Sequence, residues 1–275
     1  MGSRVKLGAW LVAEDRDRAF DGRSKVDNPM NERTQITVPL LTVDVRITDQ
    51  FGVQGAVSVP DVTRSALVPR PAGPAVNFSE TFSGLGDTSV LGWYRLRPID
   101  KWFVVTTFGG SLPTGKTETP RFKTDLVEGS LVPTSRLQRG SGTVDPLLGA
   151  SLTRKFGVGT VFTSLAARVP LYQNKEGLRT GASSELNTGF AREIFTTRIS
   201  TFARLGWLHR AQDQFQGTPV LVGGGNWIHL SPGIAAQVGK GINVQAEVKL
   251  PIYRSLANKQ LDSAAIFQFG VSRSF

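Results

Sequence analysis

Two histidines, His209 and His229, are the residues of this 275-residue chain whose side chains exchange protons near neutral pH. A histidine that acts as a general base needs a nucleophile or a carboxylate within hydrogen-bond reach. Only Ser231, Ser183 and Asp213 fall in segments that could bring such a group near them. The two histidines are expected to lie in consecutive strands and to approach each other, but we interpret them as rim residues and predict that the protein is not an enzyme.

Residues 109–117 (Gly-Gly-Ser-Leu-Pro-Thr-Gly-Lys-Thr) end like a phosphate-binding loop. The glycine spacing of that motif is absent, Pro113 interrupts it, and no helical pattern follows. The chain has no cysteine, which excludes thiolate metal sites, disulfides and cysteine nucleophiles, and its His, Asp and Glu residues lack metal-ligand spacing. The sequence therefore predicts no cofactor and no metal.

Charged side chains are the remaining source of chemistry. The 32 Lys and Arg outnumber the 22 Asp and Glu, but they are spread along the chain without a long basic run, which argues against nucleic acid as a partner. Many of these charges stand opposite apolar residues in alternating segments, which indicates a wet interior. The lumen-lining candidates are Lys6, Asp44, Arg46, Arg95, Asp145, Arg168, Glu185, Arg198, Arg204, Glu247 and Lys249.

Two interpretations of this interior set stay open. Rings of Arg and Lys favour anions in an open, water-filled pore, and basic residues are in excess here. Mixed charges on neighbouring strands can instead pair with each other and plug the barrel.

The elements that must position these charges are strands. About twelve segments alternate apolar and polar residues, as in residues 242–253, and no segment has the roughly 18 consecutive apolar residues of a membrane-spanning helix. The predicted strands are 4–13, 34–47, 51–60, 88–97, 101–113, 143–154, 158–171, 184–193, 195–208, 227–238, 242–253 and 263–275.

Short and long connections alternate between these strands. The short turns are 48–50, 98–100, 155–157, 193–194 and 239–241, and the long loops are 14–33, 61–87, 114–142, 172–183, 209–226 and 254–262. Transmembrane barrels place short turns in the periplasm and long loops outside. The sequence therefore predicts an all-β fold: a transmembrane antiparallel up-and-down β-barrel of about twelve strands, one domain over residues 1–275, with both termini periplasmic and any export signal missing from this chain.

A soluble sandwich or lipocalin-like barrel would also alternate. Its dry core could not hold the Gly, Ser, Thr, Gln and charged residues that stand opposite the apolar face here without a cost of several kcal/mol per unpaired charge. The apolar face is therefore expected to meet membrane lipids and lipopolysaccharide in a bacterial outer membrane.

Aromatic residues support this placement. The chain ends in an alternating strand closed by Phe275, which is similar to the C-terminal signature of bacterial outer-membrane barrels, and Arg273 is expected to reach the headgroups. Aromatics at strand ends predict two girdles. The girdle residues are Phe51, Tyr94, Trp102, Phe195 and Phe275 near the periplasm and Tyr172, Trp207, Trp227 and Tyr253 near the outside.

Several short stretches resemble the outer-membrane barrel family of meta-pathway phenol-degradation transporters. The similarity covers roughly 84–195 and is carried by residues 84–90 (Gly-Leu-Gly-Asp-Thr-Ser-Val), 93–96, 110–116, 140–145 (Gly-Ser-Gly-Thr-Val-Asp) and 162–171. The resemblance implies uptake of aromatic compounds. We interpret the Gly-Leu-Gly-Asp stretch as a structural corner, with Asp87 beginning the lumen-facing register. Trp93 replaces the family's usual basic residue and would narrow the pore.

We therefore expect an outer-membrane conduit for small solutes, aromatic, hydrophobic or anionic. The alternative is a non-conducting barrel that serves as a scaffold or partner for another envelope protein. The 114–142 loop, the longest connection and a basic one, either folds inward to control access or stays a mobile external loop.

Overall fold

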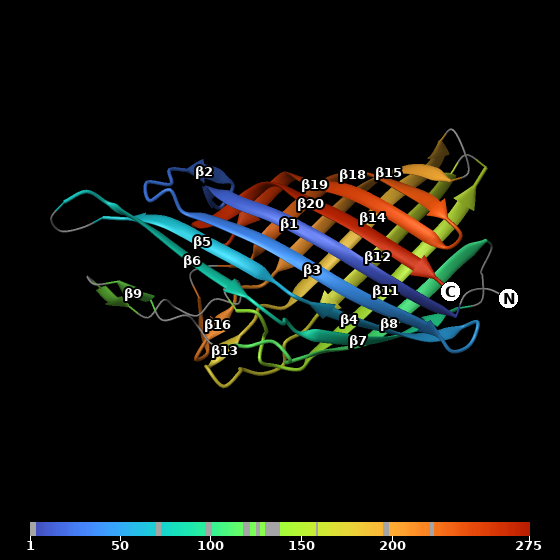
Figure 1. The fold of residues 1–275 in the computed structure, drawn as a ribbon, viewed down its shortest axis with the longest axis horizontal. Coiled ribbons are helices and arrows are strands. Elements are labelled where there is room, and N and C mark those ends of the chain that lie inside the picture. Colours follow the sequence, from blue (N-terminus) through green and yellow to red (C-terminus); the bar gives the residue numbers. More distant parts are fainter. Residues whose placement is uncertain are drawn as a thin grey trace.

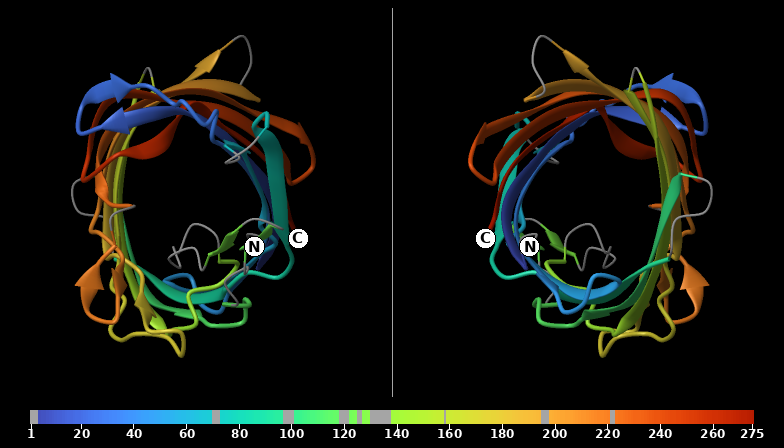
Figure 2. Two further views of the ribbon diagram at one scale, coloured as in Figure 1. Left: turned by 90° about the vertical axis from the view of Figure 1, so that its left-hand side faces the viewer. Right: turned by 90° about the vertical axis from the view of Figure 1, so that its right-hand side faces the viewer.

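The computed structural model describes residues 4–69, 73–96, 101–117, 122–124, 127–129, 138–157, 159–194, 198–220 and 223–275, and all regular structure in them is β. The main sheet closes because β1 (Val5–Asp21) pairs with both β20 (Gln260–Ser274) and β3 (Arg33–Arg46). The strands form a ring when viewed end on (Figure 2). Within the described part of the chain, no helix is long and apolar enough to cross a membrane.

Twelve antiparallel strands make this closed barrel, as predicted. Two of them are interrupted. β4 (Phe51–Ser58) and β5 (Asp61–Val68) both pair with β3 and together form one strand. β6 (Val76–Ser83) pairs with β5, β7 (Thr88–Arg95) pairs with β4, and together they form the next strand. The other strands are β8 (Trp102–Leu112), β11 (Asp145–Phe156), β12 (Gly159–Arg168), β14 (Ser183–Ile194), β15 (Ile199–Arg210), β18 (Gly225–Gly239) and β19 (Ile242–Leu256) (Figure 1).

Short strands lie in the long connections. They are β2 (Ser24–Val26), which pairs with β1, the β9 (Phe122–Thr124) and β10 (Val127–Gly129) hairpin, and the small sheet of β13 (Leu178–Arg179), β16 (Gln214–Phe215) and β17 (Thr218–Pro219).

The barrel is apolar outside and polar inside. Large apolar side chains such as Leu41, Leu148 and Phe267 are more than half exposed, whereas Asp145 and Ser231 are almost fully buried. Strand geometry sends successive side chains to opposite faces, so one sequence supplies both surfaces. A surface of this kind is stable in lipid and costly in water.

The height of the apolar band follows from β1. Its outward residues are apolar from Val5 to Ala13, a span of about nine residues that matches a transmembrane strand. The next outward residue, Asp15, pairs with Arg33 on β3. The band therefore ends at this ion pair.

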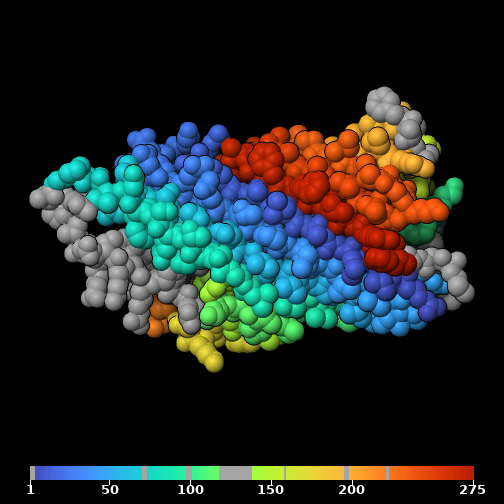
Figure 3. Space-filling model, in the orientation of Figure 1, coloured from blue at the N-terminus to red at the C-terminus, as the bar shows by residue number. Residues whose placement is uncertain are grey.

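The predicted loop 61–87 is wrong, because most of it is strand. β5 and β6 form a hairpin that extends the barrel wall and projects at the end away from the short turns (Figure 3). Its outward pairs are polar, including Thr63 with Thr81, whose hydroxyls are 2.9 Å apart, and Ser65 with Ser79. The sequence of these two strands has no apolar face for lipid, so its pattern predicted a loop instead of strands.

Two other predicted loops are also shorter than expected. β1 continues to Asp21, which removes much of the 14–33 loop, and only residues 257–259 separate β19 from β20 in place of a 254–262 loop. The turns at 48–50 and 239–241 are confirmed, the turn near 193–194 lies after β14, and 98–100 falls outside the described residues.

Both chain ends lie at the short-turn end of the barrel. The Arg4 amide donates to the Phe275 carbonyl oxygen at 3.0 Å, and the start of β1 and the end of the last strand β20 lie at the same end of the barrel in Figure 1. Arg273 and Phe275 point outward here, with the guanidinium 4.7 Å from the ring centre. Arg154 stacks similarly on Trp102, at 5.3 Å.

The predicted girdles need one correction. Trp227 is buried, and its indole N–H donates to Asp262 at 3.0 Å on the inner wall. The next residue, Ile228, pairs with the outward-facing Trp207 and faces lipid instead. Successive residues of a strand face opposite sides, so the register of β18 puts Trp227 inside. Phe195 lies outside the described residues.

Candidate functional site: the barrel lumen and its mouth

The candidate site is the lumen, and the strand register places most of the predicted lumen residues on its wall. Ten residues share the face opposite the exposed apolar side chains: Lys6, Asp44, Arg46, Arg95, Asp145, Arg168, Glu185, Arg204, Glu247 and Lys249. Arg198 differs, because it lies one residue before β15 and is exposed at the short-turn rim.

An ion pair between Arg204 and Glu247 lies deep in the lumen. Arg204 on β15 reaches across β18 to Glu247 on β19. The β18 residues between them are Ser231, paired with Arg204, and Gly233, paired with Glu247, and their small size leaves room for the crossing. The Glu247 side chain is 2% exposed and that of Arg204 is 21% exposed. The carboxylate is therefore withdrawn into the wall, and the guanidinium borders the lumen.

A second pair crosses more of the interior. Lys249 on β19 approaches Glu185 on β14, with Nζ and Oε1 3.7 Å apart, although β15 and β18 lie between these strands. A distance of this size across two intervening strands requires both side chains to extend over the lumen. Lumen charges are thus matched in pairs along one side of the wall.

Aromatic and acidic groups meet near the short-turn end. The Trp93 indole N–H donates to Asp44 at 3.1 Å, and a Cβ on the facing Gly52 would collide with the indole ring. Arg95 lies 6.0 Å from the Trp93 ring centre, and Arg46 lies 4.0 Å from Asp49. The expected bulky ring is therefore on the inner wall, held by an acidic partner.

The long-loop end is organised around Asp87. Its carboxylate accepts hydrogen bonds from the Gly115 amide at 3.2 Å and from both the amide and the hydroxyl of Ser141 at 2.7 Å. A Cβ on Gly140 would lie 2.7 Å from the Gly115 Cα, so glycine at 140 permits this close approach. The predicted corner at Asp87 is thus a clamp that ties both ends of the 114–142 loop to the barrel mouth.

Arg168 completes this cluster. Its Nε donates to Asp145 at 2.8 Å, its Nη2 lies 3.9 Å from Asp87, and Asp145 also accepts from the Thr143 hydroxyl at 2.6 Å. Charge-assisted hydrogen bonds of this kind are about twice as strong as neutral ones. The cluster fixes the guanidinium at the inner rim, where its side chain is 35% exposed.

A polar cavity of about 420 Å³ opens beside this cluster. Its wall combines the clamp with Arg210, whose guanidinium lies 3.0 Å from Asp213, and with Gln138 and Thr180. The last two are each 8% exposed, and both amide atoms of Gln138 and the hydroxyl of Thr180 have no hydrogen-bond partner among the described residues. Buried polar atoms without partners are rare in native proteins.

A less polar cavity of about 220 Å³ adjoins it. The two share Leu147, Arg168 and Ser183, and the second adds Leu91 and Leu208. The two cavities are therefore neighbours, one with a polar lining and one with a more apolar lining.

The two histidines do not form a site. His209 faces outward, where it stacks with Trp207 at a ring distance of 6.2 Å, whereas His229 on β18 faces inward beside Gly206. The expectation that they approach each other is wrong, because the register puts them on opposite faces of the wall. The described residues also hold no group of three or more His, Cys, Asp or Glu that could bind a metal.

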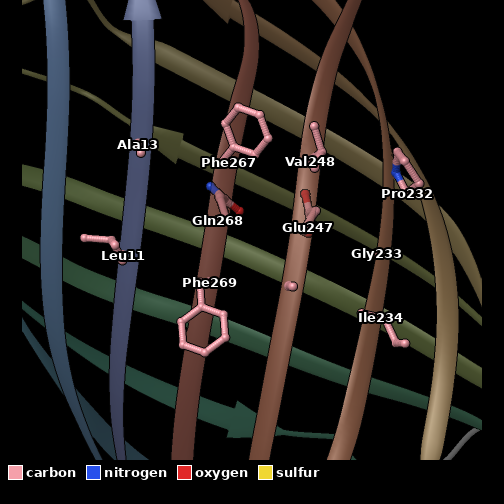
Figure 4. Close-up of a pocket in the computed structure, with 11 residues that line it drawn as sticks. Leu11, Ala13, Pro232, Gly233, Ile234, Glu247, Val248, Phe267, Gln268 and Phe269 are labelled. Atoms are coloured by element: carbon pink, nitrogen blue, oxygen red, sulfur yellow. The ribbon is translucent and has the colours of Figure 1, made fainter.

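An apolar groove runs along the outer surface. Phe267 and Phe269 of β20 flank it with Leu11 of β1 and Ile234 of β18, and Figure 4 shows these side chains on the strands that line the groove. Small residues such as Ala13 form its floor. Glu247 and Gln268 also border the groove, but they belong to the inward-facing set of their strands, so the outer surface here is apolar and suits lipid acyl chains.

Sequence reasoning missed three of the cavity residues. Arg210 continues the inward alternation of Arg204 and Leu208, so extending the predicted strand by two residues would have found it. Gln138 and Thr180 lie outside the barrel strands, in connections without periodicity. Only the folded path of the loops brings these two residues to the cavity.

No family model matches the sequence, and no curated protein matches it either. Among solved structures, the chain aligns over its full length with the COG4313 outer membrane channel from Pseudomonas putida F1, covering 96% of that chain at 14% identity and a TM-score of 0.74. The transport unit of the autotransporter AIDA-I from Escherichia coli aligns with 99% of this chain and 90% of its own at 10% identity and a TM-score of 0.55.

The translocator domain of the autotransporter NalP from Neisseria meningitidis aligns with all of this chain and 90% of its own, at 9% identity and a TM-score of 0.53. These likenesses show a shared fold. Together with the apolar outer band and the polar lumen, they make this chain a β-barrel of the bacterial outer membrane.

Proposed function

We propose that this protein is a channel for the passive passage of small solutes across the bacterial outer membrane. The observation that carries the proposal is a closed barrel with a polar inner wall and two adjoining cavities, of about 420 and 220 Å³. A wall of paired charges, hydroxyls and amides is compatible with water and with small solutes. The COG4313 protein of the same fold is itself described as an outer membrane channel.

Anion preference is part of this proposal. In three of the pairs the acidic partner is withdrawn into the wall: Asp145, Asp213 and Glu247 have side chains between 0% and 2% exposed. The Lys249–Glu185 pair is the exception, because its carboxylate side chain is 36% exposed and its lysine 19%. The basic partners in the other three pairs, Arg168, Arg210 and Arg204, are between 21% and 35% exposed. A passing ion therefore meets guanidinium groups first, although the pairs are electrically balanced. The ten wall residues and the rim residue Arg198 are proposed to line the solute path, and uptake of aromatic compounds remains a prediction from the family resemblance.

Single-channel recording in planar bilayers tests the proposal. Folded protein, identified by its heat-modifiable gel mobility, should give discrete conductance steps with a reversal potential that indicates anion preference. Trp93→Ala should raise the unit conductance, because it removes an inward ring, whereas Trp207→Ala on the outer face should leave it unchanged.

The absence of conductance steps from folded protein would contradict the proposed channel function. A silent barrel that co-purifies with a second envelope protein would support the scaffold alternative. Equal conductance in the parent and the Trp93→Ala variant would show that the Trp93 ring does not narrow the current path.

A further inference from the structure

We propose that the two adjoining cavities at the barrel mouth together bind a small amphipathic carboxylate, a solute with one carboxylate group and a compact apolar body. This inference rests on the proposed channel function and names the class of solute that the site selects. Its starting point is the set of unpartnered atoms of Gln138 and Thr180, which are more than nine-tenths buried and line the polar cavity.

The polar cavity supplies donors for an oxyanion. The Gln138 amide nitrogen and the Thr180 hydroxyl are donors without partners among the described residues, and the guanidinium groups of Arg168 and Arg210 line the same cavity. Burial without a partner is costly for each such group, because the hydrogen bonds it made to water are not replaced. A ligand oxygen that accepts these hydrogen bonds recovers that cost and gains charge assistance from the guanidinium groups.

The acidic residues of the mouth do not cancel this preference. Asp145 is saturated by Arg168 and Thr143, and Asp87 is saturated by Gly115 and Ser141. Both carboxylates are therefore hydrogen-bonded to groups of the barrel wall and the adjoining loop. The guanidinium groups remain the charged surface that faces the cavity.

The adjoining cavity sets the orientation of the solute. Leu91, Leu147 and Leu208 line it, which suits a ring or a short branched chain. Glu185 also lines it and is held by Lys249 at 3.7 Å, so a carboxylate is disfavoured at that end. The carboxylate thus lies against Gln138 and the apolar body lies against the leucines. Pockets of several hundred cubic ångströms hold small organic ligands.

Isothermal titration calorimetry of the full chain in detergent tests this site with three probes. Sodium benzoate carries both features, benzyl alcohol has the ring without the charge, and acetate has the charge without the ring. Benzoate should bind about tenfold more tightly than either comparison probe, because each loses one set of contacts. Equal affinity for benzoate and acetate, or no benzoate binding, would overturn the proposal.

Two near-isosteric variants locate the site. Gln138→Leu and Thr180→Val should each weaken benzoate binding about tenfold, because each removes a hydrogen bond to a charged group. The matched controls Gln245→Leu and Thr160→Val make the same changes on the lumen wall nearer the short turns and should leave affinity unchanged. Parental affinity in either cavity variant would overturn the site, and each variant tests it independently if the other fails to fold.

Conductance recorded on the same preparation separates this inference from the channel function. A conducting parent that does not bind benzoate would refute the carboxylate site and leave the channel standing. A folded parent that binds benzoate but does not conduct would refute the channel and leave the site in place.

Discussion

The Arg204–Glu247 pair gives the sharpest test of how the lumen is built. Glu247→Gln keeps the volume of the side chain and removes its charge, which leaves the Arg204 guanidinium without its carboxylate in the wall. Removing one partner of a buried pair costs 3–5 kcal/mol, and because Arg204 is 21% exposed we expect about 3 kcal/mol. The double variant with Arg204→Gln should recover much of this loss.

The same substitution should change ion selectivity. One unpaired positive charge acting on an anion about 8 Å away through water contributes roughly 0.5 kcal/mol, or about a twofold rise in local anion occupancy. In Glu247→Gln the reversal potential should therefore shift toward the equilibrium potential of the anion, and in Arg204→Gln toward that of the cation. In the double variant it should return to the parental value.

The assay consists of two measurements on four proteins: the parent, Glu247→Gln, Arg204→Gln and the double variant. Urea unfolding in detergent gives the stability cycle, in which the coupling energy should be about 2 kcal/mol. Bilayer recording in a salt gradient gives the selectivity cycle. Additive stability effects with an unchanged reversal potential would refute both the pairing and the place of these residues on the ion path.

Three further outcomes are expected. Asp87→Ala should lower the free energy of unfolding by about 2 kcal/mol in urea titrations and speed protease cleavage near Ser141, because three hydrogen bonds are lost. Gly189→Ala should cost about 1–3 kcal/mol in the same titrations, because a Cβ there would lie 2.6 Å from the Ala203 carbonyl oxygen. Deleting residues 118–136 should leave the heat-modifiable barrel intact, because both flanking strands keep their partners, and it should change conductance if the loop controls access.

The barrel could be predicted because lipid and water impose a period of two on each strand. In β19, outward Ile252 is largely exposed while inward Glu247 is buried, and the sequence of that segment alternates in the same way. The β5–β6 hairpin escaped prediction because it stands beyond the lipid. Its outward residues, such as Thr63 and Thr81, are polar, so no apolar face distinguishes it from a loop.

The contacts of the lumen could not be predicted from alternation alone. Parity places Arg204 and Glu247 on the same face, but their pairing depends on the strand register and on the small residues of β18 between them. Trp227 was assigned to the wrong face because its position near a strand end suggested a girdle, while its register sends it inward to Asp262. A shift of one residue reverses the face of a side chain, so an assignment without register fails at such positions.

Four of the five stretches that carry the family resemblance meet at one place in the fold, and this limits what the resemblance can say about the solute. Asp87, Gly115, Ser141, Asp145 and Arg168 come from four separate stretches and form one connected set of hydrogen bonds and ion pairs at the mouth. Every link in that set joins protein to protein, so these residues fix the path of the long loop. Solute choice then depends on the exposed guanidinium of Arg168 and on the cavity residues that the clamp brings into position, whose polar atoms remain available to a ligand. A channel could therefore keep this clamp and change its solute by substitution at those cavity positions.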